Sequence, residues 1–171
     1  MGGTPPGGSF EPGATVSAAV TMSDGAGGSS GEALIVLSST ASACSDAGAM
    51  PPVERKGSRA MTITLMDVTN GTTAAPTAPG TYTIYPNTGS QPPKEALLDM
   101  IGLDGTCQQV DADAAQGQSG TVTLTLVAGG VFKGSYDVVL NTGDHVTGSF
   151  DPSACPALQS ITAPTQSPAC N

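Results

Sequence analysis

Apolar and polar residues alternate along three segments between residues 121 and 150. Residues 121–126 read Thr-Val-Thr-Leu-Thr-Leu, and a period of two recurs at 132–140 and 146–150. Successive side chains of a strand point to opposite faces of its sheet, so this period predicts strands buried on one face. Gly-containing turns at 128–130 and 141–144 separate the three segments. We therefore expect a C-terminal antiparallel meander.

Five earlier segments carry weaker strand patterns. They are residues 14–22, 34–37, 61–65, 81–85 and 97–103. In the segment 14–22, Ser17 falls on the polar face. The continuous apolar run 34–37 is typical of a strand covered on both faces. Residues 97–103 fit a strand or one helical turn, and we favour the strand. About eight strands at this spacing predict an all-β fold, either an antiparallel β-sandwich or a small β-barrel.

The segments between and beyond these strands define the expected domain organisation. Residues 1–13 are rich in Gly and Pro and predict a flexible tether. Residues 14–155 are expected to form a single β domain, in which 24–31 and 38–59 are long loops. Residues 156–171 form a Pro-, Ser- and Thr-rich tail that a disulfide would have to hold in place.

Large apolar side chains are scarce in this chain of 171 residues, which has no Trp, three Phe and three Tyr. Each buried aromatic side chain contributes roughly 150–250 Å² to a core, so other sources of stability are expected. The four cysteines are an even number and contain no C-x2-C pair typical of zinc or redox sites. Disulfides fit better than four free thiols, and they indicate a secreted, periplasmic or outer-membrane location rather than the cytosol.

Four cysteines allow three pairings, and the sequence alone does not select one. Pairing Cys155 with Cys170 would pin the C-terminal tail, which leaves Cys44 to pair with Cys107. We prefer this set. The leading alternative joins Cys44 to Cys155 and Cys107 to Cys170.

The net charge of -9 excludes some classes of partner. Nucleic acids and anionic membranes are bound through clustered Lys and Arg, and the one basic cluster here is Arg55-Lys56 with Arg59. We expect that cluster to be a solvated part of the loop 38–59, with a contact to an acidic partner as the alternative. No apolar run is long enough to span a bilayer.

Two kinds of binding site have candidate residues. Asp111 and Asp113 share one face of an extended chain and, with Asp99 or Asp104, could offer oxygen ligands to Ca²⁺. The alternative is a solvated acidic loop, because no calcium-loop motif is present.

A sugar-binding groove is the second possibility. Tyr85, Lys133 and Asp137 fall on polar faces and could floor it, although no tryptophan is available to stack on a sugar. His145, the single histidine, is expected to be exposed beside a turn and therefore not to be part of a catalytic triad.

Three stretches resemble the uncharacterised secreted, β-rich lipoproteins of Gly- and Ala-rich bacterial proteomes, including myxobacteria. They are residues 79–84 (PGTYTI), 120–124 (GTVTL) and 134–155 (GSYDVVLNTGDHVTGSFDPSAC). The resemblance covers most of residues 14–155 and implies a β fold and an envelope location. The resemblance brings no catalytic residues with it. The Gly- and Pro-rich opening is also similar to the tether that follows the lipidated Cys of bacterial lipoproteins; that Cys is absent from this sequence, so a lipid anchor is a hypothesis about the parent protein.

Together these patterns predict a non-enzymatic structural or adhesive module of the bacterial envelope or cell surface. Its partner would be a surface protein or a glycan, and no cofactor is expected apart from a possible calcium ion. The alternative function is a calcium- or glycan-binding β module.

Overall fold

The computed structural model describes residues 12–23, 29–86, 88–160 and 167–171. Most of the predicted tether, residues 1–11, lies outside these ranges. The described residues are predominantly β-structure, as expected, and ten of their strands form one sheet. The sheet comprises β1 (Ala14–Ser23), β2 (Ser29–Ser38), β4 (Arg59–Thr69), β5 (Thr72–Ala74), β6 (Gly80–Ile84), β7 (Lys94–Gly102), β8 (Ala115–Ala128), β9 (Val131–Leu140), β10 (His145–Phe150) and β11 (Ser153–Ala154).

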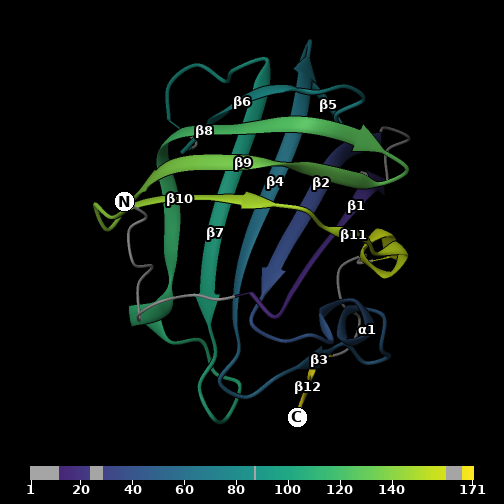
Figure 1. The fold of residues 1–171 in the computed structure, drawn as a ribbon, viewed down its shortest axis with the longest axis vertical. Coiled ribbons are helices and arrows are strands. Elements are labelled where there is room, and N and C mark those ends of the chain that lie inside the picture. Colours follow the sequence, from purple (N-terminus) through teal and green to yellow (C-terminus); the bar gives the residue numbers. More distant parts are fainter. Residues whose placement is uncertain (1–11, 24–28, 87, 161–166) are drawn as a thin grey trace.

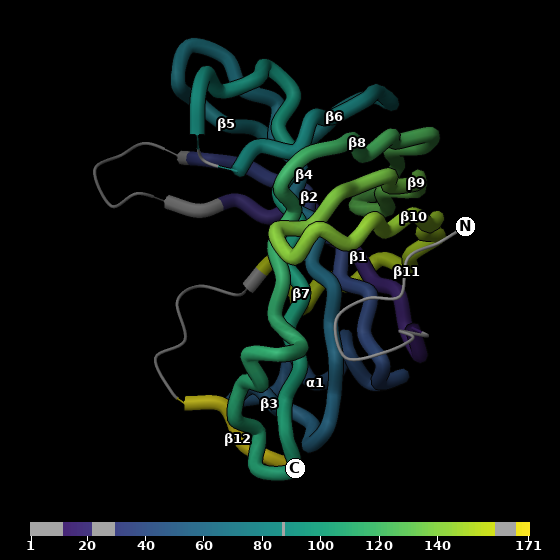
Figure 2. The backbone as a smooth tube through the Cα atoms, turned by 90° about the vertical axis from the view of Figure 1, so that its left-hand side faces the viewer, coloured from purple at the N-terminus to yellow at the C-terminus, as the bar shows by residue number. Residues whose placement is uncertain are grey.

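The strands follow the order β10-β9-β8-β6-β7-β4-β2-β1-β11, and β5 pairs with β4. Neighbours are antiparallel except for β6 with β7 and β1 with β11. The C-terminal meander β8-β9-β10 is confirmed. The sheet curls, so that β8, β9 and β10 cross in front of the strands β4, β2 and β1 (Figure 1). Figure 2 shows the same curl from the side, with β5 and β6 at one end of the molecule and the C-terminus at the other.

The main core fills the concave side of the curled sheet. Alternate residues of the strands point into it, including Ile35, Ile63, Tyr82, Val122 and Phe132, all between 0% and 2% exposed. The threonines that alternate with these residues lie on the other face, as the period of two predicted. The curled sheet thus buries three aromatic side chains, Tyr82, Phe132 and Phe150, in this core.

A second, smaller core lies on the outer face of β1 and β2. There Val16, Ala18 and Val20 pack with Cys155 and Leu158, beneath α1 (Ala43–Ala47) and the 3-10 helix η2 (Pro156–Ser160). The prediction of a strand covered on both faces at 34–37 is thus confirmed.

Ser17 was expected on a polar face, and this expectation was wrong. Its side chain is 0% exposed, because the curl of the sheet brings β9 over β1. The Ser17 hydroxyl donates to the Gly130 carbonyl at 2.9 Å and accepts from the Phe132 N–H at 3.3 Å. A serine is tolerated in the core here because both of its hydrogen-bonding roles are satisfied.

Two expected loops and the tail contain regular structure. Residues 38–59 include α1 and β3 (Val53–Glu54), and residues 29–31 already belong to β2. In the tail, β12 (Ala169–Cys170) pairs with β3 in a separate two-stranded sheet. These elements are too short to give a periodic signal. Residues 97–103 form a strand, as favoured, since β7 spans Lys94–Gly102.

Candidate functional site

The disulfides join Cys44 to Cys155 and Cys107 to Cys170. The preferred pairing of Cys155 with Cys170 and of Cys44 with Cys107 was therefore wrong, and the alternative set is the one observed. The physical reason is the position of the tail. η2 packs beside α1 and brings Cys155 to Cys44, while β12 pairs with β3 near the loop that carries Cys107. Two disulfides are consistent with an extracellular or periplasmic protein.

Three of the four predicted calcium ligands each contact a different neighbour. Asp113 pairs with Arg59 at 3.2 Å, and Asp99 accepts from the Gln116 amide at 3.0 Å. Asp104 caps its own loop by accepting from the backbone N–H groups of residues 106 and 108, which lowers its pKa. Asp111 is exposed in the 3-10 helix η1 (Asp111–Asp113). Among the described residues, no three metal-ligating side chains gather into a site.

The residues predicted to floor a sugar-binding groove are held at separate places. Lys133 pairs with Asp151 at 2.6 Å, and Asp137 contacts His145 at 2.6 Å, both on the exposed outer face of β9 and β10. Tyr85 instead follows β6 and lines a cavity further along the sheet. His145 is exposed beside a turn, as expected.

The predicted basic cluster does not present three free charges. Arg55 donates through Nε to Asp46 at 2.9 Å, and Arg59 pairs with Asp113. The Arg55 guanidinium holds the pKa of the Asp46 carboxyl below its usual range, with a further contribution from the Ser42 hydroxyl. These arginines fasten α1 and η1 to neighbouring segments.

A polar cluster surrounds the hydroxyl of Tyr82, the middle residue of β6. Tyr82 and Lys94 both donate to Asp67 Oδ1 at 3.0 Å, and the Lys94 ammonium lies 4.7 Å from the centre of the Tyr82 ring. Burial raises the pKa of Tyr82, and the hydrogen bond to Asp67 raises the pKa of Lys94. Both groups keep their protons at neutral pH, and their hydrogen bonds to Asp67 tie β4, β6 and β7 together.

A groove opens where β8 changes its pairing partner. β8 pairs with β6 over residues 121–124 but with β7 at residues 115–116. Between these two ladders β8 has a register shift at Gly117/Ser119. β6 lies between β7 and β8 and ends at Ile84. Beside Leu97 and Leu98 the edges of β7 and β8 are still apart, and β6 no longer fills the space between them. Figure 1 shows β8 turning from a course alongside β7 to a course across the sheet.

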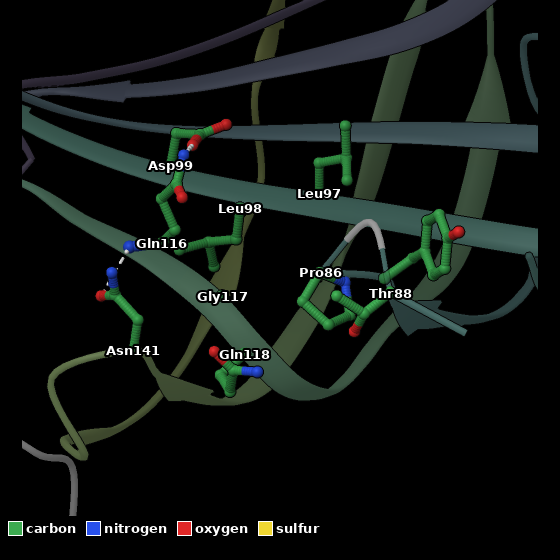
Figure 3. A pocket seen from close by; sticks show the side chains of 10 residues that line it. Pro86, Thr88, Leu97, Leu98, Asp99, Gln116, Gly117, Gln118 and Asn141 are labelled. Carbon is green, nitrogen blue, oxygen red and sulfur yellow. Dashed lines mark hydrogen bonds between the residues drawn. The ribbon is translucent and has the colours of Figure 1, made fainter.

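The larger cavity of this groove has a volume of about 280 Å³. Its lining combines apolar surface with amide, carboxyl and hydroxyl groups: Tyr85, Pro86, Thr88, Leu97, Leu98, Asp99, Gln116, Gly117, Gln118 and Asn141. Figure 3 shows Asp99, Gln116 and Asn141 beside one another at one end, and Pro86 and Thr88 towards the other. Gln116, Gln118 and Asn141 are exposed, so a ligand can reach them.

A second cavity of about 260 Å³ adjoins the first. The two share Asp99, Gln116 and Asn141, and the second adds Met100, Ile101, Gln109, Ala114 and Ala115. We call the two cavities together the seam groove. Ile101 contributes an exposed apolar side chain (41% exposed).

Hydrogen bonds hold the shared residues of the seam groove in place. The Gln116 side-chain amide donates to Asp99 Oδ1 at 3.0 Å. The Gln116 backbone N–H donates to Asn141 Oδ1 at 3.1 Å, and the Asn141 N–H donates back to the Gln116 carbonyl at 2.8 Å. These side chains are therefore oriented before any ligand arrives.

The sequence analysis included Tyr85 and Asp99 but missed the amide residues. Gln116 and Gln118 are two apart at the start of a strong strand pattern, which places them close together on β8. That spacing could have identified the two glutamines as neighbours on one face of a strand. No signal in the sequence pointed to Asn141, because its position opposite Gln116 depends on the pairing of β8 with β9.

Comparisons with protein-family models, with curated proteins and with solved structures gave no match. Within the residues that the structure describes, no helix has the length and apolar character needed to cross a bilayer.

Proposed function

We propose that this chain is a non-enzymatic adhesive module of the bacterial envelope or cell surface, and that it adheres by binding a glycan in the seam groove. The curled sheet would be a small barrel that serves as a rigid scaffold. The resemblance to secreted β-rich lipoproteins is in keeping with this location, and a lipid anchor in the parent protein belongs to the same proposal.

The observation that carries the proposal is the lining of the seam groove. Sugars present hydroxyl groups that both donate and accept hydrogen bonds, together with C–H faces that pack on apolar surface. Asp99, Gln116, Gln118 and Asn141 supply donors and acceptors. Tyr85 supplies an aromatic ring, the side-chain type that combines a large apolar surface with a polar end.

A binding role suits the titratable groups near the groove better than a catalytic role. Asp99 is the one carboxyl group among the lining residues of the two cavities, whereas glycoside hydrolysis ordinarily uses a pair of carboxyl groups. The groups whose pKa is raised by burial, Glu32, Tyr82 and Tyr136, lie outside this lining.

A pull-down assay with insoluble polysaccharides tests the proposal. The oxidised protein is mixed with cellulose, chitin, xylan, mannan and peptidoglycan, and the bound fraction is measured by gel densitometry. We expect retention on at least one neutral polysaccharide, with the glycan recovered at unchanged chain length. No retention on any glycan, or shortening of the glycan, would overturn the proposal.

Two single variants localise the binding to the groove. Gln118→Ala removes an exposed amide that lines the larger cavity, and we expect it to reduce the bound fraction. Gln108→Ala removes an exposed amide outside the lining of either cavity and serves as the matched control. Equal retention of both variants and the wild type would place binding elsewhere on the surface.

A further inference from the structure

The seam groove has the shape of two adjoining compartments. The larger holds about 280 Å³ and the smaller about 260 Å³, and the Asp99–Gln116–Asn141 row forms the boundary that they share. Each volume is slightly below the range of roughly 300–1,000 Å³ that is typical of pockets for drug-sized ligands. Each compartment therefore suits a unit the size of one sugar ring, and the two together suit a linear chain.

Each compartment offers its own apolar surface and its own amide. Tyr85, Pro86 and Gln118 belong only to the larger compartment. Ile101 and Gln109 belong only to the smaller one. A chain lying along the seam would thus meet an apolar surface and an amide twice, once on each side of the shared row.

The shared row keeps hydrogen-bonding capacity after its internal bonds are made. Asp99 uses Oδ1 for the Gln116 amide, which leaves Oδ2 as an acceptor. Asn141 uses Oδ1 for the Gln116 backbone N–H, which leaves its side-chain NH₂ as a donor. Gln116 keeps Oε1 as an acceptor. A pair of neighbouring hydroxyl groups, each of which can donate and accept, matches this set.

The charges of the groove select against anionic chains. The lining residues of the two cavities include Asp99 and no Lys, Arg or His. Four of the five basic residues of the chain are already held in ion pairs, and the net charge is -9. A chain of uronic acids or sulfated sugars would meet like charge with no compensating cation.

We infer that the seam groove is a two-subsite site for an uncharged, linear glycan, with the Asp99–Gln116–Asn141 row holding the hydroxyl groups near the linkage between two adjacent rings. This inference rests on the proposed function and specifies its ligand. The subsite with Tyr85 and Gln118 takes one ring, and the subsite with Ile101 and Gln109 takes the next.

The test is a calorimetric titration with oligosaccharides of one to five units. The neutral probes are cello-, xylo-, manno- and chito-oligosaccharides, the last in their N-acetylated form, and the anionic probe is an oligogalacturonate series. We expect the affinity for one neutral series to rise by about ten-fold or more from one unit to two or three and then to level off. We expect the anionic series to bind at least about ten-fold more weakly.

Two variants separate the subsites. Gln118→Ala and Gln109→Ala each remove one exposed amide from one compartment, and each should weaken binding of the two- and three-unit probes by about three- to ten-fold. For a single sugar, only the variant of the subsite that it occupies should lose affinity. Gln108→Ala should match the wild type, and thermal unfolding verifies that all three variants fold.

The outcomes distinguish the inference from the proposed function. Neutral binding that does not depend on chain length, or tighter binding of the oligogalacturonates, overturns the two-subsite inference and leaves glycan adhesion standing. Failure of every glycan, soluble and insoluble, to bind overturns both.

Discussion

At the scale of single residues, Gly120 permits the bend of β8 that opens the seam groove. Its φ is +121°, and a Cβ at this position would lie 2.2 Å from the Asp137 carbonyl oxygen of the neighbouring strand. A side chain would therefore be excluded both by the backbone conformation and by the contact with β9.

Gly120→Ala is accordingly expected to lower the free energy of unfolding by about 3 kcal/mol or more, measured by urea denaturation. Gly105→Ala is the control, because a Cβ there meets nothing within 4 Å and its φ is not in the left-handed region. It should change stability by less than about 0.5 kcal/mol. Equal effects of the two substitutions would contradict the account of the bend.

Asp46 links the stability of the fold to pH. The residue is buried (7% exposed), and the pKa of its carboxyl is lowered chiefly by the hydrogen bond from Arg55. A carboxyl whose pKa is lower in the folded than in the unfolded state contributes stability above its unfolded pKa, near 3.8. This contribution is lost as the pH falls through the lower, folded value.

We therefore expect Asp46→Asn to be less stable than the wild type at neutral pH, with the difference narrowing below about pH 4. Thermal unfolding between about pH 7 and about pH 2 measures the difference. The difference in stability between the wild type and Arg55→Gln should narrow over the same pH range, because Arg55 is the main cause of the lowered pKa of Asp46. A difference that stays constant down to about pH 2 would contradict this role for Asp46.

At the scale of elements, the disulfides fasten α1, η2 and the C-terminal strand β12 to their neighbours. Cys44–Cys155 joins α1 to the start of η2, across 111 residues of sequence. Cys107–Cys170 joins β12 to the loop after β7, across 63 residues. In the chain-entropy model each bond contributes about 4–5 kcal/mol by restricting the unfolded chain.

Tryptic digestion without reduction distinguishes the observed pairing from the one preferred from the sequence. Lys and Arg residues lie between Cys44 and Cys107 and between Cys107 and Cys155, whereas none separates Cys155 from Cys170. The observed pairing predicts one product in which three peptides are linked. A peptide 134–171 released with an internal disulfide would contradict it.

The two bonds should also differ in their effect on stability. Cys155 is 1% exposed and lies within the smaller core on the outer face of β1 and β2, whereas Cys170 is exposed. Cys44→Ala with Cys155→Ala removes packing as well as a crosslink, so we expect it to lower the free energy of unfolding more than Cys107→Ala with Cys170→Ala. Urea denaturation of the two double variants measures this. A larger loss from the second pair would show that packing around Cys155 does not matter.

The sequence predicted the strands well because their signal is local. The threonine alternation at 121–126 and the glycines of the two meander turns specify β8, β9 and β10 without reference to distant residues. It did not predict α1 or β12, whose five and two residues are too few to show a period. The cysteine pairing was also out of reach, since loop-closure entropy differs little between the possible loops.

The seam groove was only partly predictable for a related reason. It exists because β6 is inserted between β7 and β8 and ends before them. That strand order depends on long-range pairing, which no local pattern encodes. Asp99, Gln116 and Asn141 meet only once this order is established.

At the scale of the whole molecule, the acidic excess is not compensated locally. Asp46, Asp113, Asp67 and Asp151 each pair with a basic residue, and the ten remaining acidic residues together with Lys56 give the net charge of -9. Such a charge favours solubility and repels polyanions.

If the ligand is an uncharged glycan, its affinity should not depend on the electrostatic field of the negatively charged protein. We expect the affinity to change by less than about two-fold between about 0.05 M and about 0.5 M NaCl, measured by calorimetry. A drop of about ten-fold across this range would indicate that ion pairing contributes to recognition.

The central claim is that the seam groove is the binding face, and NMR mapping of an isotope-labelled sample tests it most directly. On titration with the best-retained neutral oligosaccharide, we expect the largest shifts at the backbone and side-chain amides of Gln116, Gln118 and Asn141, and at the backbone amide of Asp99. Shifts concentrated instead on the outer face of β9 and β10, around Lys133 and His145, would contradict the account.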